Sequence, residues 1–507
     1  MNNTISLKKT MESISQKKLH NHIVFSNAYF YKFDAKQWRN KTPFPPLGTI
    51  YAASYLRENG FTVDLFDTNL LDSVDSLQPF LEKREPAFFV LYDDGFNYLT
   101  KMCLTTMREA AFKMIETAKS LGFTVICSSS DATDHYEKYL EKGANVVIQG
   151  EGEITLRETV LAFQNSQSLS EIDGIVFKEN DTIIKNKGRI VLKDLDKLSQ
   201  PAWDLIALDA YKKVWKASKQ NFTLNIATTR GCPYKCNWCA KPIYGNRYNS
   251  HSPKYIVQQI KFLSEEFNVN RFWMCDDIFG LKPNWVQEFN KELKKENLDI
   301  SYYIQSRADL LLKEDTIDAL AESGLEEAWI GAESGSQKIL DAMDKGTTVD
   351  QIYTATRLLK EKKVRIAFFI QFGYLTENKE DIQKTIDMIQ ELVPDNIGIS
   401  VSYPLPGTKF YDKVKDDLRL KANWTDSDDL AMMFEGTFNS KFYKKLHRFV
   451  HKEFRKSQAK EYFKQLFLNP TSMSIKKIRT ILLYAYYGPT SVIDKIILQK
   501  IENTNAK

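Results

Sequence analysis

The sequence predicts an α/β protein: an N-terminal doubly wound parallel sheet of the Rossmann-like kind, then a partial (β/α)6 barrel of the TIM type, then a helical C-terminal extension. Short apolar runs alternate with amphipathic segments in two long stretches, a pattern typical of parallel sheets covered by helices. The alternation is interrupted between about residues 165 and 220, and it stops after Pro406 and Gly407. With 507 residues, the chain is long enough for two large domains and an appendage.

The first domain is expected over residues 20–164. Its strand candidates are residues 23–30, 61–67, 88–94, 123–130 and 145–153. Helix candidates between them cover residues 47–59 and 104–122, and Gly122 is a typical helix end. In such sheets the ligand binds beyond the carboxyl ends of the strands. The loops there contain Pro45, Pro46, Leu47, Gly48, Asp93, Asp94, Gly95, Ser128, Ser129, Ser130, Gly150, Glu151 and Gly152.

Residues 165–220 are expected to link the two domains, with a hairpin over residues 172–191. The barrel is expected over residues 221–410. Its six strand candidates are residues 224–230, 271–277, 301–307, 327–334, 365–373 and 396–406. Active residues of such barrels collect at the carboxyl ends of the strands. Residues 411–507 are expected to form basic, aromatic helices.

Three cysteines, Cys232, Cys236 and Cys239, lie within eight residues directly after the first barrel strand. Thiolates with this spacing can bind one cuboidal iron–sulfur cluster and leave one iron open. A zinc knuckle with His251 as the fourth ligand and a chance grouping are the alternatives. Six cysteines are too few for a disulfide framework and indicate a reducing compartment. The other three are expected to be buried apolar residues: Cys103, Cys127 and Cys275.

The CxxxCxxC motif, the preceding Thr229-Arg230-Gly231 and the aromatic Trp238 resemble the radical SAM superfamily. The resemblance implies that the three cysteines ligate three irons of a 4Fe–4S cluster. The amino and carboxylate groups of S-adenosylmethionine would take the fourth iron, and reductive cleavage would yield a 5′-deoxyadenosyl radical.

The resemblance also implies contacts with S-adenosylmethionine at the ends of the later strands. Asp276 and Asp277 would receive the methionine amino group, with a helix N-cap as the alternative role for one of them. Arg307 would bind the carboxylate, or else form a structural salt bridge. Glu333 would contact the ribose, or else act as a cap. The further candidates are Trp238, Ser306, Ser334, Gln371, Gly373 and Tyr374.

The order of a doubly wound domain, a linker and a cluster barrel resembles the cobalamin-binding radical SAM subfamily. The local marks are PFPPLGTIYAASYLREN, VVIQGEGEITLRE and the turn from Tyr403 to Gly407. Two departures matter: Ser128-Ser129-Ser130 replaces a Gly-Gly-x-His-like turn, and no DxHxxG motif offers a histidine to cobalt. His135, the nearest, is expected on a helix surface. The resemblance implies a cobalamin site formed by Leu47, Gly48, Asp93, Asp94, Ser128, Ser129, Ser130, Gly150, Glu151 and Gly152; an empty domain is the alternative.

The function that this resemblance implies is cobalamin-dependent methyl transfer to an unactivated carbon. An oxidative or cyclising reaction of the anaerobic porphyrin-ester cyclase type is the second possibility, and a non-catalytic cluster-binding scaffold is the third. The expected partners are a small-molecule substrate of lipidic or tetrapyrrole character and a reductant such as flavodoxin or ferredoxin. Nucleic acid is not expected, since no recognisable binding module is present. The sequence assigns no catalytic residue beyond the cofactor contacts.

The net charge of +5 is unevenly distributed. Residues from Lys441 to Lys507 contain fifteen Lys and Arg against four Asp and Glu, interleaved with aromatic residues. Such helices lie at membrane surfaces, although solvated faces packed on the barrel explain the pattern as well. No apolar stretch reaches the length of a membrane span, and no signal peptide is evident. We therefore expect a cytoplasmic protein, with peripheral membrane contact as the open alternative.

Overall fold

The computed structural model describes residues 21–418 and 422–505, which divide into two compact units. The first unit contains the chain up to Pro233 together with residues 240–277 and 423–429. The second contains residues 234–239, 278–422 and the chain from Leu430 onward. The boundary between the units therefore passes through the cysteine motif.

The sheet of the first unit has seven strands in the order β2-β1-β3-β4-β5-β6-β7. Strands β1 to β5 are mutually parallel. This order belongs to the flavodoxin-like doubly wound sheets, in which ligands bind at the switch point between β1 and β3. The hairpin of β6 and β7 adds two antiparallel strands to the edge. The bounds are β1 His22–Ser26, β2 Thr62–Phe66, β3 Phe88–Tyr92, β4 Thr124–Ser128, β5 Val146–Ile148, β6 Ile175–Glu179 and β7 Thr182–Lys185.

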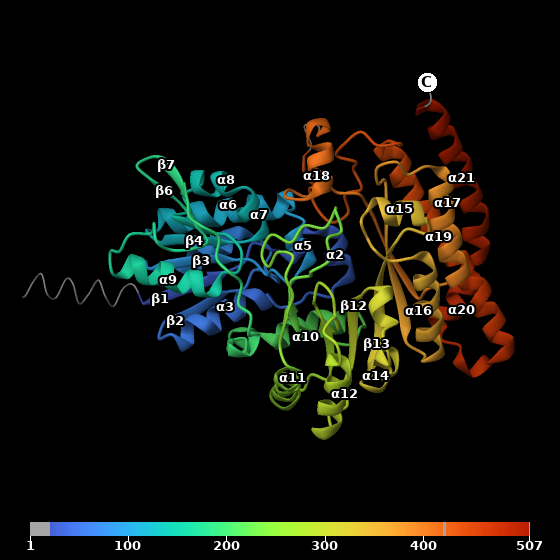
Figure 1. Cartoon of the computed structure of the whole chain (residues 1–507), viewed down its shortest axis with the longest axis horizontal. Helices are drawn as coiled ribbons and strands as arrows, with labels where there is room; N and C mark the ends of the chain where they lie inside the picture. Colours follow the sequence, from blue (N-terminus) through green and yellow to red (C-terminus); the bar gives the residue numbers. More distant parts are fainter. Residues whose placement is uncertain (1–20, 419–421, 506–507) are drawn as a thin grey trace, which may run out of the picture. The chain divides into compact units, whose positions relative to one another are not determined.

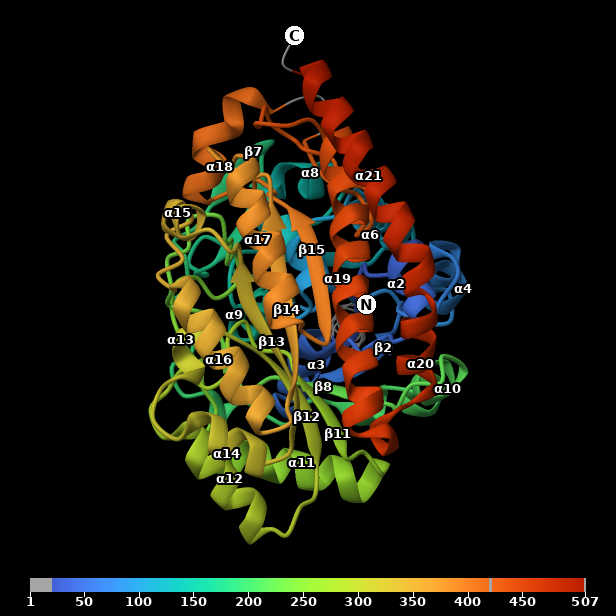
Figure 2. The ribbon, with the colours of Figure 1, turned by 90° about the vertical axis from the view of Figure 1, so that its right-hand side faces the viewer.

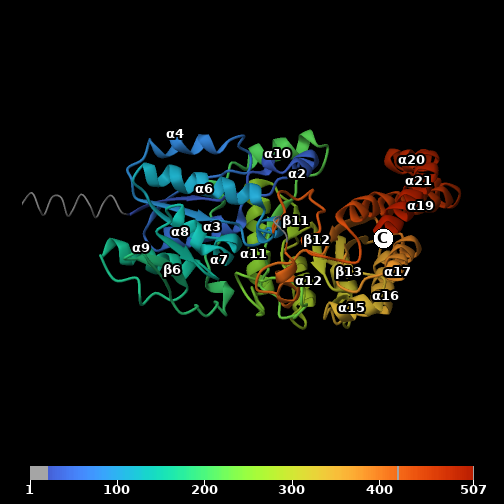
Figure 3. The ribbon, with the colours of Figure 1, turned by 90° about the horizontal axis from the view of Figure 1, so that it is seen from above.

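Two apolar cores cover the two faces of this sheet. Helices α4, α6 and α8 contribute to one core, and α3 and α9 contribute to the other. Figure 3 shows α4 and α6 on one side of the sheet and α9 on the other. Helix α6 ends before Gly122, whose φ of +85° is the left-handed conformation expected there. The bounds are α3 Leu47–Glu58, α4 Leu77–Leu81, α6 Thr105–Ser120, α8 Tyr136–Glu141 and α9 Glu153–Gln164.

The first barrel strands belong to the first unit. Strands β8 (Leu224–Ile226) and β11 (Arg271–Met274) pair in parallel. Helix α11 (Pro253–Phe267) lies between them in the chain, capped by the Ser252 side chain and begun by a proline. The short strands β9 (Thr229–Arg230) and β10 (Asn249–Ser250) pair antiparallel. The two ends of the segment that contains the cysteines therefore lie side by side.

The second unit holds the remaining four barrel strands, which pair in parallel and in chain order. They are β12 Ser301–Ser306, β13 Leu325–Glu333, β14 Arg365–Phe372 and β15 Asn396–Val401. The helices after them include α13 Ala308–Leu311, α14 Thr316–Glu322, α15 Gln337–Ala342, α16 Val349–Glu361 and α17 Lys379–Leu392. All eleven strands predicted for the two sheets are present at their predicted places.

The basic C-terminal region forms three helices on the second unit: α19 Ser440–Leu468, α20 Ile475–Leu482 and α21 Tyr484–Asn505. Helix α19 packs against α17 and β15, and α21 runs along α19 (Figure 2). Within the described ranges, no helix carries an apolar stretch of membrane-spanning length. The other helices are α2 Ala35–Asn40, α5 Tyr98–Lys101, α7 Ser130–Asp134, α10 Leu208–Ala217, α12 Trp285–Lys295 and α18 Lys409–Val414 (Figure 1).

Candidate functional site

Asn237, between the second and third motif cysteines, fixes the loop to the second unit. Its backbone N–H donates to the Met343 carbonyl at 3.0 Å, and its side-chain amide donates to the Ala342 carbonyl at 2.7 Å. Its amide oxygen accepts from the Tyr374 hydroxyl at 2.6 Å, and its own carbonyl accepts from Phe410 N–H at 2.9 Å. Asn237 is therefore an anchor of the loop that the sequence analysis missed, although its place between two cysteines was a signal.

Trp238 adds an apolar anchor beside this polar one. Its ring packs against a buried cluster that includes Met343, Tyr374, Phe410 and Phe434. This packing accounts for an aromatic residue before the last cysteine, and a contact with S-adenosylmethionine stays a prediction.

The six thiols fall into two groups. Cys232, Cys236 and Cys239 are partly exposed, and the other three are buried as predicted. Burial raises the pKa of Cys103, Cys127 and Cys275, which keeps these thiols protonated and unsuited to metal binding. Within residues 21–418 and 422–505, no three His, Cys, Asp or Glu side chains converge on one point. Support for an iron–sulfur cluster at this loop therefore comes from the spacing and partial exposure of the three motif thiols, together with the anchoring of the loop by Asn237.

His251, the candidate fourth ligand of a zinc knuckle, lies in a buried stack of the first unit. Its ring is 3% exposed and stacks on Tyr255 with centroids 4.2 Å apart. Its Nδ1 lies 3.1 Å from a carboxylate oxygen of Asp196. These contacts account for His251 as a structural residue.

Two buried cations of the second unit lie beside Cys236. The Arg307 Nη1 is 3.9 Å from the Cys236 sulfur, and the guanidinium lies 3.8 Å from the ring centroid of Tyr234. Arg307 also donates to Asp309 at 2.8 Å and to the Thr347 hydroxyl at 2.9 Å. Arg307, predicted to bind the carboxylate of S-adenosylmethionine, thus lies beside the loop that carries the motif cysteines. It also forms a structural ion pair, which was the alternative prediction for this residue.

The second cation, Lys345, was not predicted. Its ammonium lies 2.8 Å from the Glu333 carboxylate, and both side chains are buried. Burial alone would lower the pKa of Lys345, but the negative charges of Glu333 and of a Cys236 thiolate raise it above its ordinary value. Gly331 makes room for the ammonium, because a Cβ there would lie 2.7 Å from it. Lys345 and Arg307 together place two buried positive charges near Cys236.

The serines predicted at the ends of the strands have local partners. Ser306 donates to the Phe279 carbonyl at 3.3 Å. Ser334 accepts from Ser336 N–H at 3.1 Å and lies 3.1 Å from the Thr385 hydroxyl. Both serines thus have hydrogen-bond partners within the second unit, and their predicted contacts with the cofactor stay predictions.

Asp276 holds the turn that precedes the cysteine motif. Its carboxylate accepts from the backbone N–H groups of Thr228 and Thr229 at 2.7 and 2.8 Å, and from the Thr228 hydroxyl at 2.6 Å. Burial raises the pKa of Asp276 to about 7 although these hydrogen bonds act to lower it. Its neighbour Asp277 pairs with Lys101 of α5. Neither carboxylate caps a helix; both join elements of the first unit.

Arg230, two residues before Cys232, is buried between two carboxylates of the predicted cobalamin-binding segment. Its Nη1 lies 2.5 Å from Glu151, and its Nη2 lies 2.6 Å from Glu153. The side chain of Arg230 is 3% exposed, and those of Glu151 and Glu153 are 8% and 4% exposed. The rings of Tyr51 and Tyr244 flank the guanidinium at 5.7 and 5.3 Å. The carboxylate of Glu151, predicted to contact cobalamin, therefore ties β9 to the segment after β5.

A small cavity lies at the carboxyl ends of β3 and β4, where a doubly wound sheet binds its ligand. Its lining consists of Tyr92, Asp93, Gly95, Thr100, Ser128, Ser129, Ser130, Ile243 and Tyr244. The Ser130 hydroxyl is buried with no hydrogen-bond partner among the described residues. A polar cofactor group in this cavity would satisfy it, so the lining fits a ligand of that kind. Ile243 and Tyr244, which follow the cysteine motif, were not predicted.

Four of the ten predicted cobalamin residues line this cavity: Asp93, Ser128, Ser129 and Ser130. Asp94 instead accepts from Gly48 N–H and Phe96 N–H, both at 3.0 Å, and so fixes the start of α3. Burial raises the pKa of Asp93 to about 7 and that of Asp94 to about 6. Gly152 packs on the Tyr92 ring, since a Cβ there would lie 2.7 Å from it. The remaining predicted residues, Leu47, Gly150 and Glu151, do not line the cavity.

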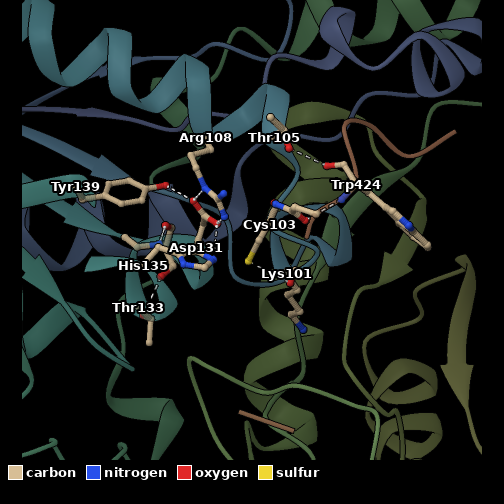
Figure 4. A network of polar contacts seen from close by, with 12 residues as sticks. Lys101, Cys103, Thr105, Arg108, Asp131, Thr133, His135, Tyr139 and Trp424 are labelled. Atoms are coloured by element: carbon tan, nitrogen blue, oxygen red, sulfur yellow. Dashed lines mark hydrogen bonds and ion pairs between the residues drawn. The ribbon is translucent and has the colours of Figure 1, made fainter. Parts of the chain in front are cut away.

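Helix α7, which begins at Ser130, is held by Asp131 (Figure 4). Arg108 of α6 donates to both Asp131 oxygens at 2.8 and 2.5 Å, and the Tyr139 hydroxyl donates at 2.8 Å. His135 lies between α7 and α8, partly buried, with Nε2 4.0 Å from Asp131. The network positions the serine turn at the end of the cavity.

Glu377 is a buried carboxyl group beside the predicted adenine contact Gly373. It accepts from Gly373 N–H at 2.7 Å, and its other oxygen has no hydrogen-bond partner among the described residues. A Cβ on Gly373 would lie 3.2 Å from the Tyr443 ring, and the φ of Gly373 is +78°. Burial raises the pKa of Glu377 to about 8. The folded protein therefore keeps this proton over a pH range in which the unfolded chain has lost it.

Glu377→Gln is expected to remove the loss of folding stability that the wild type undergoes as pH rises. Because the folded pKa is raised, the contribution of Glu377 to stability is present at low pH and is lost as pH rises toward about 8. The amide still accepts from Gly373. The unfolding free energy of the variant relative to wild type should therefore increase between pH about 5 and about 8, on the order of a few kcal/mol. Denaturant titrations at the two pH values check this, and parallel changes in both proteins would refute it.

In a comparison with known proteins, residues 226–389 match the radical SAM superfamily. An uncharacterized methyltransferase of Pyrococcus horikoshii is 26% identical over 392 residues, which cover 76% of this chain and 81% of that protein. The anaerobic magnesium-protoporphyrin IX monomethyl ester cyclase of Rubrivivax gelatinosus is 23% identical over 390 residues, 74% of this chain and 67% of its own.

Two solved structures have the same fold. The cobalamin-dependent S-adenosylmethionine radical enzyme OxsB, with aqua-cobalamin and S-adenosylmethionine bound, matches with a TM-score of 0.69 at 18% identity, over 94% of this chain and 72% of its own. The methyltransferase TsrM from Kitasatospora setae, with cobalamin and a 4Fe–4S cluster bound, matches with a TM-score of 0.65 at 15% identity, over 78% and 75%. These matches confirm the predicted fold, in which a doubly wound parallel sheet is followed by a partial (β/α) barrel.

Proposed function

We propose, because residues 226–389 match the radical SAM superfamily, that the chain binds a 4Fe–4S cluster through Cys232, Cys236 and Cys239 and cleaves S-adenosylmethionine. The observation that carries the proposal is the loop itself. Its thiols are partly exposed, Asn237 anchors its backbone, and Arg307 lies 3.9 Å from the Cys236 sulfur. In the superfamily the cluster supplies the electron that splits S-adenosylmethionine into methionine and a 5′-deoxyadenosyl radical.

Residues of the chain would hold both the cluster and S-adenosylmethionine in place. Asp276 and Arg230 fix the turn before Cys232, and Arg307 lies beside Cys236. We keep the predicted contacts with S-adenosylmethionine as part of this proposal: Trp238, Asp276, Asp277, Ser306, Arg307, Glu333, Ser334 and Gly373. Asp277 and Arg307 are the strongest of these candidates. Asp277 already pairs with the Lys101 ammonium, which the ammonium of the cofactor can replace or join. Arg307 already pairs with the Asp309 carboxylate, which the carboxylate of the cofactor can replace or join.

The first unit would hold cobalamin at the carboxyl ends of its strands, with Asp93 and Ser128 to Ser130 at the cavity. Support comes from the flavodoxin-like strand order, the unpartnered Ser130 hydroxyl and the fold match to two cobalamin-bound enzymes. Cobalamin would carry the methyl group in a transfer to an unactivated carbon. Ile243 and Tyr244 lie across the cavity, so we expect the corrinoid to contact or displace them.

The second candidate is an oxidative or cyclising reaction, which the similarity to the magnesium-protoporphyrin ester cyclase favours. A tetrapyrrole is accordingly the substrate class that we propose first, since that relative is named for a porphyrin ester. A reductant such as flavodoxin or ferredoxin would supply the electron in either reaction.

Product analysis separates these candidates. After anaerobic reconstitution with iron, sulfide and hydroxocobalamin, a methyl transfer should release S-adenosylhomocysteine together with 5′-deoxyadenosine. A cyclising reaction should release the deoxynucleoside alone. Ser130→Tyr, which fills the cavity, should abolish corrinoid retention measured by absorption, whereas Ser120→Tyr on the exposed face of α6 should leave it unchanged. Equal retention in both variants would contradict the proposed cobalamin site.

A further inference from the structure

An exposed apolar surface lies where α19 ends and α20 begins. Five side chains there are far more exposed than large apolar residues usually are: Phe463 at 51%, Phe467 at 72%, Leu468 at 84%, Ile475 at 87% and Leu482 at 72%. No residue of α20 is buried. We call this region, completed by Leu466 and Ile478, the tail surface. An apolar patch of this kind on a folded unit indicates a binding surface.

The geometry of α20 turns its apolar face outward. Lys477 donates to the Gln465 side chain of α19 at 3.1 Å and lies over the Tyr462 ring, so this side of α20 faces α19. Ile475 and Leu482 lie about two turns apart on one side of the helix, roughly opposite Lys477. The helix is thus held by a lysine and presents its isoleucine and leucine side chains to the surroundings.

The chain segment that carries this apolar face, between Glu461 and Asp494, has charges of a single sign. The chain from Tyr462 to Ile493 contains four Lys and Arg and no Asp or Glu. Of these, Lys464, Lys476 and Arg479 are exposed. Bulky apolar side chains rimmed by uncompensated bases are complementary to a lipid surface with anionic headgroups. The described helices include none able to span a membrane, so the contact would be made at the interface.

We propose that the tail surface docks the protein onto membranes that carry anionic lipids. The apolar side chains of α20 and of the end of α19 enter the boundary between headgroups and acyl chains, and the three exposed bases contact the headgroups. This inference does not depend on the reaction that the enzyme catalyses.

Vesicle flotation of the full-length chain tests the proposal. The protein should float with phosphatidylcholine vesicles that contain phosphatidylglycerol, and high salt or pure phosphatidylcholine should weaken the binding. The double variant Ile475→Glu and Leu482→Glu, and the double variant Lys476→Glu and Arg479→Glu, should each lower the partition coefficient at least about tenfold.

The matched control is the double variant Ile183→Glu and Ile190→Glu, which adds the same two charges at sites of 39% and 67% exposure in the first unit. It should bind vesicles like wild type. All variants should keep the wild-type thermal transition, since none of the replaced side chains is buried.

Failure of wild type to float with anionic vesicles at low salt would overturn the proposal. So would equal binding of the wild type and both tail variants. If light scattering instead shows a dimer that the α20 substitutions dissociate, and no vesicle binding, the tail surface is an interface between copies of the chain and the proposal is wrong.

Discussion

Replacing Arg230 by methionine is expected to lower the free energy of unfolding by about 3–5 kcal/mol. The guanidinium is 3% exposed and forms ion pairs with Glu151 and Glu153, which are nearly as buried. Methionine leaves two buried carboxylates close together without a counter-ion, and this arrangement is strongly unfavourable. The fall should appear in denaturant titrations followed by fluorescence and circular dichroism.

Two controls make this result specific. Arg57→Met removes an ion pair on the surface, in which the guanidinium binds both oxygens of Asp204 at 2.6 and 3.0 Å, and should cost less than about 1 kcal/mol. Combining Arg230→Met with Glu151→Gln and Glu153→Gln removes the unpaired charges and should restore much of the lost stability. If Arg230→Met costs no more than Arg57→Met, the buried ion pairs do not hold this part of the first unit together.

Cys236→Ala is expected to abolish cluster binding. Two thiolates cannot replace three, and alanine also removes the negative charge that Arg307 and Lys345 face. The reconstituted variant should contain little iron and sulfide and should lack the cluster's absorption and its paramagnetic resonance signal after reduction. Cys275→Ala is the matched control, because Cys275 is 3% exposed and its thiol donates to a carbonyl in the first unit. Full cluster content in Cys236→Ala would contradict the assignment of the ligands.

The fold could be predicted from the sequence because each layer leaves a periodic pattern. Strand β3, for example, is buried along its whole length and reads as an apolar run, and α6 is amphipathic and followed by a glycine in the left-handed conformation. The hairpin of residues 172–191 was predicted, but not that it would pair with β5, because the edge residues carry no mark of their neighbour. The predicted domain boundaries stay predictions.

The site was less accessible to sequence reasoning, because partners far apart in the chain decide what a polar residue does. Arg230 and Glu151 are separated by 79 positions, and Asp276 finds its donors 47 and 48 positions away. The residue types at these positions are suited to cofactor binding. In the structure, however, their side chains already form hydrogen bonds or ion pairs with other residues of the protein. Asn237 and Lys345 were missed for the same reason. The tail illustrates a further limit: its composition indicated membrane contact or a solvated face packed on the barrel, and membrane contact stays a proposal that rests on the side-chain exposures of α20.

The central claim is that this chain uses a cluster held by Cys232, Cys236 and Cys239 to cleave S-adenosylmethionine. The most direct test is to reconstitute the protein anaerobically, reduce it in the presence of S-adenosylmethionine, and quantify 5′-deoxyadenosine by chromatography. The account predicts that wild type and Cys275→Ala form it only when reduced, and that Cys236→Ala forms none. A wild-type protein that carries the complete cluster and is reduced, yet yields no 5′-deoxyadenosine and no S-adenosylhomocysteine, would contradict the account.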